Sequence, residues 1–200
     1  MFKKTILTLF LSLIVISCSK DNNSVNPIDT MTAEDMQFVR EEEKLARDVY
    51  LHSYDKYQLQ IFKNISNSEQ SHMDAILGQL EKYNVSDPVG DNARGVFVNA
   101  TLQDLYNQLT ARSDTSLVEA LKVGALIEDL DIFDIESIIK RASQSSIITV
   151  YNNLTCGSRN HLRSFTSELK INGGDYENIY ISDEYYNQII SSDIEKCGNN

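Results

Sequence analysis

The sequence is poor in the residues that make turns and cross-links. Its 200 residues include 8 Gly, 2 Pro and 3 Cys, and no Trp. A fold of many short strands needs frequent turns, so this scarcity of Gly and Pro favours long helices. Three Cys are too few for a disulfide scaffold of the kind that holds small secreted domains together. The length fits a single domain.

Basic residues are also scarce. The chain has 18 Lys and Arg against 29 Asp and Glu, which gives a net charge of −11 at pH 7. Because nucleic acids bind to basic surfaces, this balance argues against a nucleic-acid partner. Hydrophobic residues make up 42% of the chain, which is enough for a globular core and too many for a disordered protein.

The first 17 residues have the features of a lipoprotein signal peptide. Two Lys precede an apolar run, residues 6–16, that is too short to span a membrane as a helix. The run ends in Val15-Ile16-Ser17-Cys18, which resembles a bacterial lipobox. In that motif the chain is cut before the Cys, and the Cys is lipidated. The alternatives are a simple secretory signal or a short anchor.

The lipobox interpretation fixes the expected location. Cys18 would attach the protein to a membrane of the bacterial cell envelope, and residues 18–30 would form a polar tether. Cys156 and Cys197 would then lie in an oxidising compartment. They would either form a disulfide that ties the C-terminal tail to a helix or remain two unpaired thiols, since the distance between them is not given by the sequence.

Four long helical patterns are predicted, with breaks of two lengths between them. The helices are expected at residues 32–57, 61–83, 116–142 and 147–170. Residues 58–60 and 143–146 are short breaks, whereas residues 84–115 form a long connection that contains a short helix at 102–112. Thr32, Thr101 and Ser116 are the expected N-caps, and Glu119 completes a capping box with Ser116.

The lengths of the breaks predict the topology. Short breaks imply antiparallel neighbours, whereas the long connection lets the third helix run parallel to the second. Among four-helix bundles, one long crossover of this kind marks the ferritin-like arrangement. We therefore predict an all-α fold, a ferritin-like four-helix bundle over residues 31–171. A Tyr-rich tail, residues 172–200, would follow it with a short helix after Ser182.

Polar residues interrupt the apolar stripes of these helices. The second helix carries Glu69 and His72 in mid-stripe, and the third carries Glu128 and Asp131. The fourth carries His161. The first helix has two candidate stripes, one with Glu43 and one with Glu42. Glu43 is preferred as the inward residue because the other stripe ends in His52 and Lys56.

These inward groups predict a metal site. A buried carboxylate without a partner is costly, and several that converge also repel one another. A pair of divalent metal ions removes both problems. The predicted ligands are four carboxylates and two imidazoles: Glu43, Glu69, Glu128, Asp131, His72 and His161. Such a set is typical of a dinuclear centre in a bundle core, and its oxygen and nitrogen atoms suit iron, or less favourably manganese.

Ion pairing is the competing explanation for the inward acids. Four arginines are available for it: Arg47, Arg141, Arg159 and Arg163. The acidic runs 41–43 and 128–129 are interpreted as mostly solvated, with one member of each facing inward. Tyr50 is interpreted either as a packing residue or as a hydrogen-bond donor or radical site beside the metals.

Four blocks of sequence carry a resemblance to a known family. They are residues 41–50, 61–73, 120–128 and 157–165. Together with the Tyr-rich tail, they closely resemble a bacterial and archaeal ferritin-like family of domains of unknown function (DUF2202-type), over about residues 31–190. The resemblance implies a ferritin-like fold and a metal site, without an established activity.

At longer range the first helix is similar to that of rubrerythrins, in which the ligand Glu is followed by Ala-Arg and then Tyr. This similarity implies Glu43 as a ligand. Glu128-x-x-Asp131 looks like the paired acids of the rubrerythrin third helix. Two departures from rubrerythrins matter. The usual fourth-helix Glu-x-x-His motif reads Ser158-x-x-His161 here, so one ligand is missing or is replaced by Asp131. The sequence also has no Cys-x-x-Cys rubredoxin domain.

Two functional hypotheses follow. In the first, a lipid-anchored ferritin-like protein holds two divalent metal ions and oxidises Fe(II) or reduces O2 or peroxide, with electrons from an external donor. The carboxylates would hold and bridge the metals, and the two imidazoles would be terminal ligands. In the second, the bundle is a non-redox binding or structural module of the cell envelope, and its acids are paired or hold a single ion.

Overall fold

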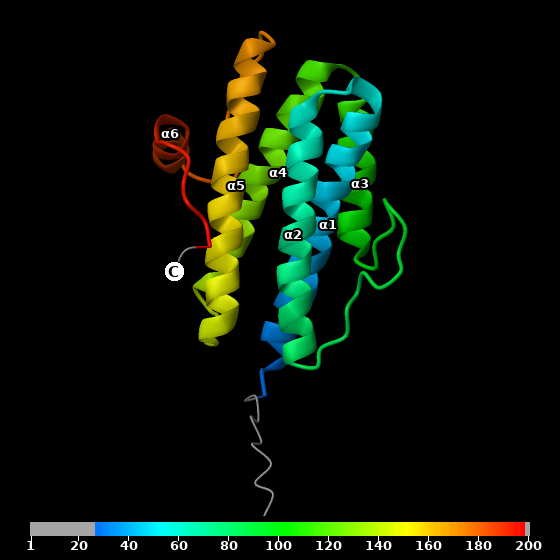
Figure 1. Cartoon of the computed structure of the whole chain (residues 1–200), viewed down its shortest axis with the longest axis vertical. Helices are drawn as coiled ribbons and strands as arrows, with labels where there is room; N and C mark the ends of the chain where they lie inside the picture. Colours follow the sequence, from blue (N-terminus) through cyan, green and yellow to red (C-terminus); the bar gives the residue numbers. More distant parts are fainter. Residues whose placement is uncertain (1–26, 199–200) are drawn as a thin grey trace, which may run out of the picture.

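The computed structural model describes residues 27–198, and all regular secondary structure in this part of the chain is helical (Figure 1). Its six helices are α1 (Thr30–Tyr57), α2 (Gln60–Lys82), α3 (Ala100–Ser113), α4 (Leu117–Ile139), α5 (Ser145–Ile171) and α6 (Asp183–Ser191). The predicted all-α class is confirmed. The predicted signal peptide and the lipidation site Cys18 lie outside the described residues.

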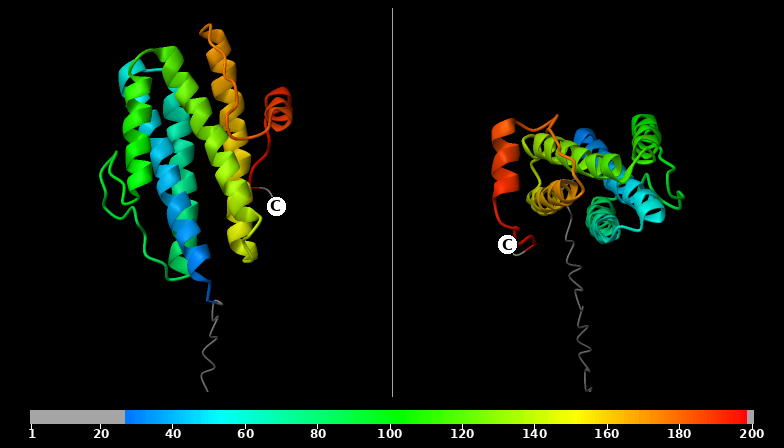
Figure 2. Two further views of the ribbon diagram at one scale, coloured as in Figure 1. Left: turned by 180° about the vertical axis from the view of Figure 1, so that it is seen from behind. Right: turned by 90° about the horizontal axis from the view of Figure 1, so that it is seen from above.

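The four long helices α1, α2, α4 and α5 pack side by side, and α3 lies against α1 and α4 (Figures 1 and 2). α1 and α2 are antiparallel neighbours, as are α4 and α5. Residues 83–99 and α3 carry the chain back along α1, so α2 and α4 point in the same direction. Within residues 27–198, no helix has the length and apolarity needed to span a membrane.

Two of the three predicted helix caps were wrong. Asp29 caps α1 in place of Thr32, because its carboxylate accepts a hydrogen bond from the Thr32 N–H at 2.7 Å. Asn99 caps α3 in place of Thr101. Asp and Asn are at least as good as Thr at this position, so the earlier residue takes it. Ser116 caps α4 as predicted.

The middle of α1 is enclosed, and the long connection covers it. The carboxylate of Glu41 accepts hydrogen bonds from the backbone N–H groups of Val98 and Asn99 at 2.6 and 2.9 Å. Lys44 is fully buried, and its ammonium donates to Asp48 at 2.6 Å and to a carbonyl of the connection. The prediction that the acidic run 41–43 is mostly solvated was therefore wrong: all three side chains are buried.

A second buried acid attaches the C-terminal tail to α4. Asp129 accepts a hydrogen bond from the Tyr176 hydroxyl at 2.7 Å. It also accepts hydrogen bonds from the backbone N–H groups of Ile179, Tyr180 and Ile181, at 2.6, 3.1 and 2.9 Å. Asp129 and its neighbour Glu128 are both buried, so the prediction of a mostly solvated pair was wrong here too.

The end of the tail is fastened to α5. Cys156 and Cys197 form a disulfide, with their Cα atoms 5.7 Å apart. This confirms the paired alternative for these two cysteines. Beside the disulfide, Glu195 forms ion pairs with Arg159 and Arg163. The tail is therefore bound to the bundle at both ends, by Asp129 and by this second cluster.

Replacing Asp129 tests the first of these attachments. Asp129→Ala leaves several backbone N–H groups without their acceptor, and we expect it to lower the free energy of unfolding by about 3 kcal/mol. Urea denaturation measures the loss. Asp193→Ala, at an exposed acid of the tail, is the matched control and should change stability by less than about 0.5 kcal/mol. Equal effects of the two variants would contradict this role of Asp129.

Candidate metal centre

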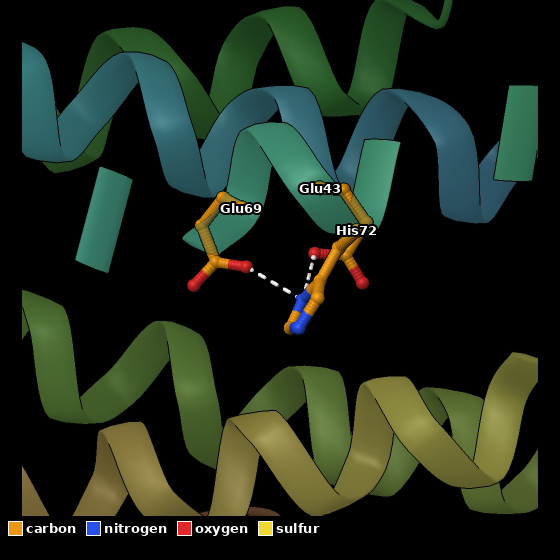
Figure 3. A group of neighbouring side chains, drawn as sticks. All are labelled: Glu43, Glu69 and His72. Carbon is orange, nitrogen blue, oxygen red and sulfur yellow. Dashed lines mark hydrogen bonds and ion pairs between the residues drawn. The ribbon is translucent and has the colours of Figure 1, made fainter. Parts of the chain in front are cut away.

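The structure brings five of the six predicted ligands into one cluster inside the bundle. α1 contributes Glu43, α2 contributes Glu69 and His72, α4 contributes Glu128, and α5 contributes His161. The carboxylates are at most 2% exposed, and the His72 side chain is 12% exposed. Figure 3 shows Glu43, Glu69 and His72 converging from α1 and α2. The mid-stripe positions of these residues on separate helices are what make them meet.

Glu69 is the middle of the cluster, because its two oxygens face different imidazoles. Oε2 lies 2.8 Å from Nδ1 of His72, and Oε1 lies 2.8 Å from Nδ1 of His161. A second carboxylate approaches each imidazole nitrogen: Glu43 at 3.1 Å from His72, and Glu128 at 3.4 Å from His161. The five side chains thus form two groups of three ligand atoms that share Glu69.

The arginines proposed as partners for these acids are engaged elsewhere. Their acidic partners are Asp48 for Arg47, Asp35 for Arg141, and Glu195 for both Arg159 and Arg163. The ion-pairing explanation is therefore wrong for these four arginines. The positive groups that the structure places beside the clustered carboxylates are the two imidazoles.

Several ligand atoms are buried without a hydrogen-bond partner. They are Oε1 of Glu43, Oε1 of Glu69 and Nδ1 of His161. The last two are only 2.8 Å apart, yet they are not aligned as donor and acceptor. Buried polar atoms in proteins are normally satisfied. Nitrogen and oxygen atoms this close, and without an aligned hydrogen bond, can bind one cation between them, so the donor set suits a metal.

Two side chains orient the ligands from outside the cluster. The hydroxyl of Tyr50 donates to Oε1 of Glu128 at 2.5 Å, and its ring packs against Phe165. Tyr50 thus combines both predicted roles, packing and hydrogen bonding. Nε2 of His161 lies 2.9 Å from the hydroxyl of Ser68. Such a contact fixes the ring and leaves Nδ1 available as the ligand atom.

Asp131, the sixth predicted ligand, lies outside both groups of ligand atoms. Its Oδ2 accepts a hydrogen bond from the hydroxyl of Ser158 at 2.5 Å, and its Oδ1 has no partner. Ser158 occupies the position where a second Glu-x-x-His motif would have its Glu. Burial and the negative charge of Glu128 raise the pKa of Asp131 to about 7. Asp131 is therefore a neighbour of the cluster, held by Ser158.

Glu42, the alternative ligand on α1, is buried but belongs to neither group of ligand atoms. Both of its carboxylate oxygens lack a hydrogen-bond partner. Burial, then the negative charges of Asp131 and Asp134, hold its pKa well above the usual value. The geometry therefore favours Glu43 over Glu42 as the α1 residue of the centre.

The protonation states in the cluster depend on one another. Burial lowers the pKa of each imidazole, but the attraction of the neighbouring carboxylates raises it by more. Glu43 and Glu69 raise the pKa of His72 well above its ordinary value, and Glu69 with Glu128 raises that of His161 to about 10. Burial likewise opposes the charge of Glu69, but His161 and His72 outweigh it and hold its pKa below the ordinary value. Protons on the imidazoles therefore balance part of the negative charge.

Comparison with known proteins assigns the family. The chain matches the family described as "Uncharacterized protein domain (DUF2202)" over residues 32–193. It belongs to this family. The predicted family is thereby confirmed, whereas the more distant similarity to rubrerythrins stays a prediction.

The DUF2202 chain has an archaeal relative of known structure. This chain is 52% identical to the uncharacterized protein MJ0754 of Methanocaldococcus jannaschii over 170 residues. The matched region covers 85% of this chain and 92% of the relative. The crystal structure of the hypothetical protein MJ0754 resembles the present structure with a TM-score of 0.84, over 86% of this chain and 98% of that chain.

Gly157 is a site residue that the sequence analysis missed. A Cβ at this position would lie 2.6 Å from Nε2 of His72, so the imidazole fits against α5 because this residue has no side chain. The signal was present in the spacing, since Gly157 stands four residues before His161 and thus on the same face of the helix.

Gly157→Ala is expected to displace the His72 ring and to destabilise the protein by about 1–3 kcal/mol through overpacking. Thermal unfolding and the His72 ring NMR signals are the measurements. Gly78→Ala is the matched control in α2, where a Cβ meets no atom within 4 Å. It should instead stabilise the helix by about 0.5–1 kcal/mol. A Gly157→Ala protein as stable as wild type, with unshifted His72 signals, would refute the packing argument.

Proposed function

We propose that this protein binds two divalent metal ions, iron in preference to manganese, and uses them to oxidise Fe(II) or to reduce O2 or peroxide. One observation carries the proposal. The two oxygens of Glu69 face the Nδ1 atoms of two imidazoles, each with a second carboxylate beside it. Carboxylate and imidazole ligands suit iron and manganese, and a shared carboxylate suits a dinuclear centre.

The proposal includes the fold type. In a ferritin-like bundle, one long crossover connects two antiparallel helix pairs, and the metal ligands project inward from all four helices. The parallel course of α2 and α4 and the inward ligands from α1, α2, α4 and α5 support this assignment.

Each side chain has a distinct task in this centre. Glu43 with His72 would hold one ion, Glu128 with His161 would hold the other, and Glu69 would bridge the two. Tyr50 holds Glu128 in place through its hydrogen bond, and Asp131 is positioned by Ser158 to accept or supply a proton beside the centre. Bound iron would supply the electrons for reducing O2 or peroxide, and an external donor would restore them.

We also propose that Cys18 anchors the protein by a lipid to a membrane of the bacterial cell envelope. The support is the lipobox-like sequence after a short apolar run. The disulfide between Cys156 and Cys197 fits this location, since disulfides persist in oxidising compartments.

Metal content is the first test. Protein purified after expression with iron and manganese should contain about two ions per chain, as in other dinuclear bundle sites. Glu69→Ala should lose both ions because Glu69 belongs to both ligand groups, whereas His161→Ala should lose one. His52→Ala is the matched control, since His52 lies against Asp114 outside the cluster, and it should keep full occupancy. Elemental analysis gives the counts.

A folded, helical wild-type protein without stoichiometric metal would contradict the proposal. The buried acids would then be balanced by the protonated imidazoles. The non-redox alternative, a binding or structural module of the cell envelope, would become the leading hypothesis.

Metal binding should also release protons. The pKa of His161 is raised to about 10, so its imidazole carries a proton at pH 7 in the metal-free protein. The pKa of His72 is raised in the same direction. Each must lose its proton to bind a metal. Adding metal at pH 7 should therefore acidify a weakly buffered solution, with about one proton from each protonated imidazole, and this imidazole contribution should shrink as the pH rises toward 10. An indicator dye measures it, and binding without release would contradict the ligand assignment.

A further inference from the structure

An acidic pocket opens between α1, α3 and α4, apart from the cluster around Glu69. Its volume is about 470 Å³, and its lining includes the acids Glu42, Asp104 and Asp134. The other lining side chains are apolar or neutral, and no Lys or Arg is among them. A pocket with several carboxylates and no basic side chain attracts cations.

Glu42 is the unusual member of this lining. It is only 3% exposed, no basic or neutral donor bonds to either of its oxygens, and the polar group beside it is the carboxyl group of Asp134. A buried carboxylate without a partner lowers stability, so something other than folding has to account for it. The acid faces a pocket in which a cation would supply the missing partner.

The pocket and the metal centre are linked through two helices. On α1, Glu42 lines the pocket and the next residue, Glu43, belongs to the centre. On α4, Asp134 lines the pocket, and one turn earlier Asp131 lies beside the centre with an unpartnered oxygen. The charges of Asp131 and Asp134 both act on Glu42. Glu42 therefore has one acidic neighbour in the pocket, Asp134, and one beside the centre, Asp131.

We propose that this pocket is the uptake site for the metal: a divalent cation binds first to Glu42 and Asp134 and then passes by Asp131 to the ligands around Glu69. The inference rests on the proposed function, since it needs a metal centre as the destination. The class of ligand is a hard divalent cation such as Fe(II) or Mn(II), which carboxylates prefer.

Stopped-flow mixing with Co(II) tests the proposal, since Co(II) bound to such ligands absorbs visible light. Glu42→Gln and Asp134→Asn should each slow uptake by about tenfold or more, because each removes a carboxylate that can bind the cation, while two ions per chain still bind at equilibrium. Asp74→Asn, at an exposed acid on α2, is the matched control and should bind Co(II) at the wild-type rate.

A second readout separates uptake from a structural role. If Glu42 serves uptake and not the fold, Glu42→Gln keeps the shape of a side chain that no hydrogen bond holds, so the metal-free variant should unfold at the wild-type temperature or higher. A variant that is both less stable and slower would indicate that Glu42 only supports the fold, which overturns the proposal.

The remaining outcomes are also decisive. If both variants take up two ions at the wild-type rate, the cation enters elsewhere, for example past His72, and the uptake site is refuted while the centre stands. If Glu42→Gln loses an ion at equilibrium, Glu42 is a ligand of the centre, which also refutes it. If wild type and Asp74→Asn bind no Co(II), the metal centre and the uptake site both fall.

Discussion

The structure depends on how it tolerates several carboxylates that converge in the middle of a helical bundle, with only two imidazoles to balance them. Glu43, Glu69 and Glu128 converge there with two imidazoles beside them, and the four arginines considered as partners bind other acids. A core arranged only for stability would replace such groups with apolar side chains, which is often neutral or favourable. The bundle instead makes room for them, with Gly157 against His72 and Ser158 against Asp131. The proposed metal centre would give this arrangement a function.

Other buried acids in the same molecule show the contrast. Glu41 and Asp129 accept hydrogen bonds from backbone N–H groups of the long connection and of the tail, and they attach these segments to the bundle. Asp48 is paired with Lys44. These acids are satisfied and therefore structural. Within residues 27–198, the buried acids that have a carboxylate oxygen without a hydrogen-bond partner are Glu42, Glu43, Glu69 and Asp131. They lie in the candidate metal centre or on the proposed route to it.

Helical periodicity made much of this predictable. The long helices and the inward positions of Glu69, His72, Glu128 and His161 follow from apolar stripes, which report which side of a helix is buried. The burial of Glu41 and Asp129 was missed because their partners are backbone N–H groups about 50 residues away, in segments without periodicity. The stripes gave only a preference for Glu43 over Glu42, because α1 is covered on several sides and both of its stripes are buried in the middle of the helix.

The proposed function depends on whether Glu69 bridges two cations. The most direct measurement is an anomalous difference map from crystals grown with Mn(II) or Fe(II). Two peaks are expected on opposite sides of the Glu69 carboxylate, one next to Nδ1 of His72 and one next to Nδ1 of His161. A map with no peak in this cluster, in crystals containing excess metal, would show that Glu69 does not bridge cations.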